Sequence, residues 1–335
     1  MTDTRNQIPS VVDRTKPVAA GAPVVAVHFL GETAAFALGE EALLFVAPNG
    51  AESRVAIHAG GILAVAGDGA RILTGGDDGK VVATNAKGES ETLAADAKHR
   101  WIDRVALGPD GVIAWGAGKQ AFVRTAKGAV KSLDLPSSIG GLAFAPKGLR
   151  LAVAHYGGAS LWFPNAQAAP EMLAWKGSHL DALFSPDGKF LVTAMQEAML
   201  HGWRLIDGKD MRMSGYSAKV RSMVFTPGGK WLATSGSEQL ILWPFASKDG
   251  PMGKQPQMVA PYDKRAVAVA CHPKQEILAV GFEDGLVMLC RIDDGAEILA
   301  KGPGTGAVSA LGWSADGARL AFGTEDGEAG TIDLH

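Results

Sequence analysis

The sequence predicts an all-β fold, a single closed β-propeller built from four-stranded antiparallel blades. Three observations support this prediction. One unit of sequence recurs along nearly the whole chain with a period of about 41 residues. Each copy repeats the same turn chemistry. Glycine is also abundant, with 43 among 335 residues, as expected where many tight turns need positive φ angles.

The recurring unit is seen most easily when the second expected strand of each copy is aligned. Eight copies align in this way, at the equivalent positions Phe36, Leu73, Ile113, Ala152, Val192, Ala233, Ala279 and Ala321. The shortest interval runs from Phe36 to Leu73 and the longest from Ala233 to Ala279. Eight copies predict eight blades, with seven blades as the alternative.

Turn signals divide each copy into four expected strands. A short apolar strand ends at a turn such as Ser-Pro-Asp-Gly at 185–188, where proline presets φ and glycine takes the positive angle. The second strand leads to a hairpin such as Asp78-Gly79. A third strand and a further turn, such as Asp207-Gly208, lead to the fourth. Four antiparallel strands in about 41 residues correspond to one propeller blade.

The chain is expected to form one domain over residues 9–335, after a flexible N-terminus at 1–8. The last copy ends after three strands, so residues 9–20 are expected to supply its fourth strand and close the ring. The approximate repeats are 22–58, 59–96, 97–134, 135–174, 175–214, 215–260, 261–302, and 303–335 together with 9–20. An insertion at 244–261 enlarges the sixth repeat and is expected on the bottom face, as a tolerated surface loop or as a docking loop.

Composition restricts the partners and the compartment. Lys and Arg total 32 against 35 for Asp and Glu, and the net charge of -3 disfavours nucleic acid and anionic membranes as partners. No stretch reaches the roughly 18 apolar residues of a membrane-spanning helix, and the start lacks the apolar core of a signal peptide. We therefore expect a cytoplasmic protein, and the Ala- and Gly-rich composition suggests a bacterial one. It would act as a monomeric disc or as a subunit of a hetero-complex.

The repeats resemble the WD-repeat family of β-propellers from residue 24 to 335. The tryptophan expected near the end of the third strand is present at Trp162, Trp203 and Trp243. The Trp-Asp dipeptide of the family is absent, because Phe163, Arg204 and Pro244 follow these tryptophans, and the Gly-His dipeptide is missing as well. The resemblance implies a propeller, more often of seven blades, that acts as a non-enzymatic scaffold for a protein or peptide partner.

Motifs for catalysis are absent from the sequence. It contains no G-x-S-x-G, H-E-x-x-H or P-loop pattern, so no enzyme activity and no cofactor are expected. His58, His99 and His179 share one position, the connection into an inner strand. They could converge on zinc or copper at the narrow end of the channel, or each could form hydrogen bonds within its own blade. A propeller enzyme, or a metal- or small-molecule-binding protein that uses the channel mouth, is therefore the alternative function.

The partner site is expected on the top face, which is framed by the connections into the inner strands. Arginine, tyrosine and tryptophan, the residue types that dominate binding hot spots, gather there on the third, fifth, sixth and seventh repeats. The expected site contains Arg100, Trp101, Asp103, His179, Tyr216, Lys219, Arg221, Tyr262, Lys264 and Arg265. An acidic or extended partner would lie across these residues.

Overall fold

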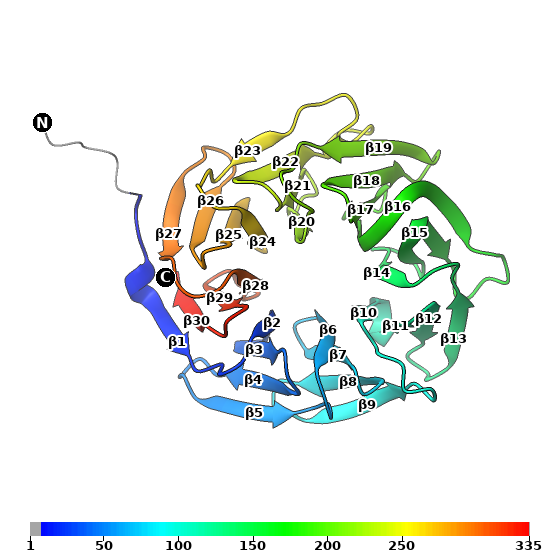
Figure 1. The fold of residues 1–335 in the computed structure, drawn as a ribbon, viewed down its shortest axis with the longest axis horizontal. Helices are drawn as coiled ribbons and strands as arrows, with labels where there is room; N and C mark the ends of the chain where they lie inside the picture. Colours follow the sequence, from blue (N-terminus) through cyan, green and yellow to red (C-terminus); the bar gives the residue numbers. More distant parts are fainter. Residues whose placement is uncertain (1–7, 335) are drawn as a thin grey trace, which may run out of the picture.

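The computed structural model describes residues 8–334, whose strands form a ring around a central channel (Figure 1). Residues 1–7, which make up most of the expected flexible N-terminus, lie outside the described residues, as does His335. The described chain contains two short 3-10 helices, η1 (Val12–Arg14) and η2 (Pro109–Gly111). Within 8–334, no helix has the length and apolar character needed to cross a membrane.

The strands form seven hydrogen-bonded sheets, all with antiparallel pairing. Five sheets contain four consecutive strands each. These are β2 (Val24–Leu30), β3 (Thr33–Leu38), β4 (Ala42–Val46) and β5 (Glu52–Ala56); β6 (Ile62–Gly67), β7 (Arg71–Gly76), β8 (Lys80–Asn85) and β9 (Ser90–Ala95); β10 (Arg104–Leu107), β11 (Ile113–Ala117), β12 (Gln120–Arg124) and β13 (Val130–Asp134); β20 (Met223–Phe225), β21 (Trp231–Thr234), β22 (Leu240–Pro244) and β23 (Gln257–Val259); and β24 (Ala266–Cys271), β25 (Ile277–Phe282), β26 (Val287–Arg291) and β27 (Glu297–Lys301).

The two remaining sheets have a different composition. One joins the chain ends and contains β1 (Thr15–Val18), β30 (Ala329–Asp333), β29 (Arg319–Thr324) and β28 (Val308–Trp313), in that order. The other has six strands, namely β14 (Ile139–Phe144), β15 (Leu151–Trp162), β16 (Glu171–Phe184), β17 (Phe190–Met195), β18 (Met199–Arg204) and β19 (Lys209–Ser214). The prediction of an all-β propeller with four-stranded antiparallel blades is confirmed.

The six-stranded sheet holds two copies of the sequence repeat. β15 turns back on itself, because His155 Nε2 lies 2.9 Å from Ser160 Oγ whereas five residues of straight strand would span about 16 Å. β16 pairs with the second half of β15 through 171–174 and with β17 through 179–184, so it runs from the fourth copy into the fifth. Counted as continuous sheets, the propeller therefore has seven blades, the alternative to eight. All eight sequence copies are present, because one blade carries two of them.

The N-terminal segment closes the ring, as the sequence predicted. β1 pairs with β30, with Thr15 opposite Ile332 and Val18 opposite Ala329. The residues just before β1 reach the neighbouring sheet, where Val11 N donates to Leu299 O at 2.9 Å and Leu299 N donates to Pro9 O at 2.8 Å. The segment from Pro9 to Val18 therefore connects the outer edges of two sheets (Figure 1).

The core lies between neighbouring sheets. The second and third strands of a copy are buried almost completely, as in β7 and β8 or β25 and β26, because both of their faces pack against adjacent sheets. Their sequences are accordingly continuous apolar runs rather than alternating ones. The outer strands β5 and β13 are largely exposed and polar. The inner strands line the channel.

The recurring Ser-Pro-Asp-Gly turn is held by its own side chains. Ser185 Oγ donates to Asp187 Oδ1 at 2.6 Å and accepts from Phe190 N at 3.0 Å, while Gly188 takes φ +74°. The equivalent turn that begins at Ser314 repeats the first two bonds at 2.6 and 2.9 Å. The repetition seen in the sequence therefore marks the start of the second strand.

Candidate functional site

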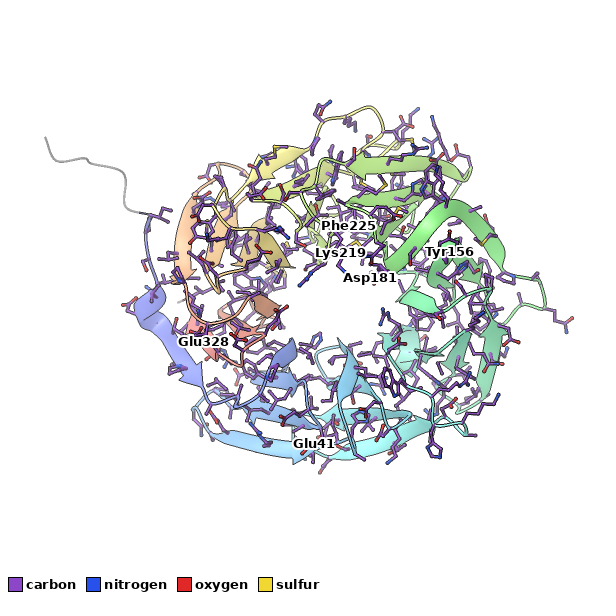
Figure 2. The ribbon with its side chains drawn as sticks, viewed as in Figure 1. Glu41, Tyr156, Asp181, Lys219, Phe225 and Glu328 are labelled. Carbon is purple, nitrogen blue, oxygen red and sulfur yellow. The ribbon has the colours of Figure 1, made fainter. Side chains whose placement is uncertain are left out.

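The central channel collects most of the charged side chains that the inner strands provide. A cavity of about 680 Å³ is lined by residues from β2, β6, β10, β14 and β16 and from the approach to β20. Its charged residues are Asp103, Arg104, Asp181, Lys219 and Arg221. Figure 2 shows Asp181 and Lys219 at the inner margin of the ring. Three residues of the expected site, Asp103, Lys219 and Arg221, thus face the channel.

Arg221 lies where three cavities meet. It lines the 680 Å³ cavity, a second of about 310 Å³ between β2, β24 and β28, and a third of about 190 Å³ beside β24. Lys219 lines the first and third of these, and Arg265 lines the third. The connection that carries Lys219 and Arg221 into β20 is therefore the point where cationic side chains of the top face reach the channel.

The ion pairs at the mouth of the channel are exposed to solvent. Arg221 Nη1 lies 3.4 Å from Glu325 Oε1, and both side chains are 56% exposed. Arg265 Nη1 lies 3.2 Å from Glu283 Oε1, also near the surface. Within 8–334, Lys219 has no carboxylate at ion-pair distance. Because exposed ion pairs contribute about 0 to 1 kcal/mol, a carboxylate from a partner could replace these acids at small cost.

Asp181 is the acid that the channel encloses. Its side chain is open to the channel, but the surrounding strands desolvate it and raise the pKa of the carboxyl above its usual value. The hydrogen bond from Ala182 N, at 2.8 Å, and the charge of Arg104 act in the opposite direction. The Arg104 guanidinium is itself held by Gly140 O, to which Nε donates at 2.5 Å. The channel thus places Asp181 beside the fixed guanidinium of Arg104.

Arg100 and Trp101 have different surroundings although they are adjacent. Arg100 Nη2 lies 2.6 Å from Asp96 Oδ1, Nη1 donates to Ala117 O, and the guanidinium lies over the Phe122 ring. The hydrogen bond from Arg100 lowers the pKa of Asp96 to about 2. Trp101 has no such packing and is 66% exposed. Of the two, Trp101 presents the free apolar surface.

Tyr262 and Lys264 lie on the connection into β24. Tyr262 OH donates to Asp284 Oδ2 at 2.8 Å, and its ring packs edge to face on Phe282. Desolvation together with this carboxylate raises the pKa of the phenol to about 12. Lys264 is half-exposed and has only Asp263, at 3.9 Å, as a neighbouring charge. Tyr262 therefore fixes the connection, while the Lys264 ammonium points to solvent.

The remaining two residues of the expected site, His179 and Tyr216, are buried. Trp243 Nε1 donates to Tyr216 OH at 2.7 Å, Tyr216 OH lies 2.8 Å from Thr234 Oγ1, and Thr234 Oγ1 donates to Ile241 O at 2.8 Å. His179 Nδ1 likewise lies 2.7 Å from Thr193 Oγ1, and Thr193 Oγ1 donates to His201 O. These two side chains join the strands of their own copies.

The same network recurs at His58. His58 contacts Thr74 Oγ1 and Asp78 Oδ1, each at 2.9 Å, and Thr74 donates to Val82 O. In each of three copies, a threonine on the second strand joins a residue of the preceding connection to the third strand. The sequence feature that indicates this network is a threonine on the second strand of three copies, at Thr74, Thr193 and Thr234.

The three histidines considered for metal binding are not brought together. His58 and His179 are each occupied within their own copy. His99 is exposed on a turn, with φ +52°. Across residues 8–334, the structure contains no group of three or more His, Cys, Asp or Glu side chains arranged to hold a metal ion.

Comparison with known proteins agrees with this architecture. Residues 269–335 match the family model described as anaphase-promoting complex subunit 4 WD40 domain, and residues 209–243 match that of the WD domain, G-beta repeat. None of the curated proteins matches the sequence. Among solved structures, the crystal structure of the computationally designed Ika8 protein is similar, with a TM-score of 0.76 and 14% identity over 97% of this chain and 99% of that one. The repeat matches at 209–243 and 269–335, together with the ring of four-stranded units, support a WD-repeat β-propeller family for this chain.

Proposed function

We propose that the protein is a non-enzymatic scaffold that binds an acidic, extended segment of a partner protein across its top face. WD-repeat propellers typically act as protein-interaction scaffolds, and this chain has the fold of that family. The observation that carries the proposal is the position of Arg221 and Lys219, where the top face meets three cavities of the channel.

The binding mode follows from the side chains that remain available. Lys219 and Arg221 would receive carboxylates of the partner, with Glu325 released from Arg221. Trp101 would cover an apolar residue on the opposite side of the channel mouth, because a large exposed indole gains most from burial. Lys264 would add charge at the rim. His179 and Tyr216 would hold the connections in place rather than touch the partner.

The proposal is tested by affinity capture from the native cell extract with quantitative mass spectrometry. Lys219→Glu combined with Arg221→Glu is expected to reduce recovery of the principal partner by at least tenfold. Lys127→Glu combined with Lys147→Glu is the matched control, because both lysines are exposed on turns of the opposite face. Equal recovery with the two double variants would contradict the proposal, as would elution of the protein alone with a stoichiometric metal ion.

A further inference from the structure

A groove on the rim of the propeller lies well away from the channel. It has a volume of about 610 Å³ and separates β19 from the insertion between β22 and β23. Its walls are Lys209, Asp210, Met211, Arg212, Ser214 and Gly215 on one side, and Trp243, residues 251–256 and Met258 on the other. Because none of these residues belongs to the top-face site, a ligand of this groove would be a separate one.

The insertion that forms one wall is fixed to the fifth repeat. Arg204 makes ion pairs with Asp207 and with Asp249 of the insertion. Phe245 packs edge to face on Phe190, with ring centroids 5.3 Å apart, and Lys254 Nζ donates to Ser247 Oγ at 2.5 Å. The wall is therefore part of the folded structure rather than a loose excursion of the chain.

The opposite wall is a strand with an unused edge. β19 pairs with β18 on one side and is the last strand in the order of its sheet. Met211 and Met213 point into the core, while Lys209, Asp210 and Arg212 are exposed. Within 8–334, no backbone group bonds to the outer side of this strand. Such an edge can accept a further strand.

The groove is cationic and partly apolar. Lys209, Arg212 and Lys254 line it and, among the described residues, have no carboxylate at ion-pair distance, whereas Asp210 is the single acid. Arg212 lies over the Trp175 ring, 4.1 Å from its centroid, which keeps the guanidinium beside the strand. Met258 adds an apolar side chain that is 53% exposed. An extended segment with acidic and apolar residues complements these features.

The molecule already binds one extended segment in this manner. Residues Pro9–Val11 lie along β27, an outer strand equivalent to β19, with Ser10 bridged in parallel to Leu299. Val11 of this segment packs against the core of the last two sheets. The outer edge of a sheet in this propeller therefore accepts an added strand when side chains beside it provide contacts.

We propose that the groove between β19 and the insertion binds an extended acidic peptide segment of another protein as an added strand. Carboxylates of that segment pair with Arg212, Lys254 and Lys209. Its apolar residues contact Met258. The site gives the propeller a second docking surface on its rim, independent of the top face.

The experiment uses a phage-displayed library of random 12-residue peptides, selected on the immobilised full chain. Selected peptides are then synthesised and their affinities measured by fluorescence polarisation. We expect peptides rich in Asp and Glu that alternate with apolar residues. Arg212→Glu combined with Lys254→Glu is expected to weaken their binding at least tenfold, because two carboxylate contacts become repulsive.

Three further double variants separate the possible outcomes. Lys209→Glu with Lys254→Glu repeats the test without disturbing the Arg212–Trp175 stack and so remains informative if the first variant unfolds. Lys127→Glu with Lys147→Glu should leave the affinity of every selected peptide unchanged. Lys219→Glu with Arg221→Glu, at the top face, should leave unchanged the affinity of the peptides that the groove variants weaken. Selection of basic peptides, or of peptides insensitive to both groove variants, would overturn the proposal. Sensitivity to the top-face variant alone would support the proposed function and exclude this groove.

Discussion

At the scale of single residues, the buried polar side chains of residues 8–334 differ in whether they have hydrogen-bond partners. His58, His179 and Tyr216 each have two partners that join strands. His201 is fully buried, its ring is stacked on Trp175 with centroids 4.1 Å apart, and neither ring nitrogen has a hydrogen-bond partner among the described residues. Asp210 Oδ2 approaches Nε2 only to 3.7 Å. His201 thus acts mainly as an aromatic ring.

From the burial of His201 we expect the stability of the folded protein to depend on pH. Burial lowers its pKa to about 4, below the value of about 6.5 for the unfolded chain. Between these values the unfolded state binds a proton that the folded state does not, so stability falls as pH decreases from about 6.5 towards 4. His201→Phe keeps the stack and removes this loss. In urea unfolding, the free energy of unfolding of the variant minus that of wild type should be about 2 kcal/mol larger at pH 5 than at pH 7.

The control for this prediction is His58→Phe. His58 has partners for both nitrogens, so its loss leaves Asp78 and Thr74 without their bonds. It should destabilise the fold by about 2 kcal/mol at pH 7. A His201→Phe variant with the same pH dependence as wild type would show that His201 does not titrate as its burial implies.

At the scale of elements, the shared sheet of the fourth and fifth copies depends on a close approach of two strands. β14 carries Gly140 and Gly141, and β16 passes directly beside them. A Cβ placed on Gly140 would lie 1.8 Å from His179 O, and one on Gly141 would lie 2.5 Å from the Cα of Asp181. The absence of side chains at these positions lets the backbone that carries Asp181 reach the channel wall.

Gly140→Ala should therefore destabilise the protein by about 3 kcal/mol or more, because the new methyl group meets backbone rather than a flexible side chain. Gly228→Ala is the matched control, since a Cβ there meets nothing within 4 Å. Thermal melting measures both. Equal melting temperatures for the two variants would show that β14 and β16 can separate without cost.

The sequence predicted the elements better than their connections. Turn residues such as Pro186 and Gly188 mark strand ends locally, so the strand pattern was readable from the chain alone. The close approach of β14 to β16 was not, because it brings Gly140 beside the backbone of His179 in a different strand. Likewise the clustering of Arg, Tyr and Trp did not distinguish the exposed Trp101 from the buried Tyr216, whose partners lie 18 and 27 residues away.

At the scale of the whole molecule, ring closure links the two ends of the chain. β1 fills the last sheet, and Pro9–Val11 extend onto the sheet beside it. The segment covers two outer edges that would otherwise be free to pair with other chains. Lys16 Nζ and Asp333 Oδ2, 3.1 Å apart, add an exposed ion pair at the junction. The stability of the propeller should therefore depend on a few residues near its start.

Deletion of residues 1–18 should lower the melting temperature by about 10 °C or more, because the last sheet loses a whole strand. Differential scanning calorimetry measures the change, and light scattering should detect aggregation through the exposed edge of β30. Deletion of residues 1–7 is the control and should lower the melting temperature less than the longer deletion, since it retains Pro9–Val18. An unaltered transition after the longer deletion would rule out closure by β1.

Binding of a partner across the top face can be tested by cross-linking mass spectrometry of the captured complex with a carbodiimide, which couples lysine amines to neighbouring carboxylates. We expect cross-links from Lys219 and Lys264 to an acidic segment of the partner, and none from Lys127 or Lys147. Cross-links from Lys127 or Lys147 alone would place the partner on the opposite face and contradict binding across the top face.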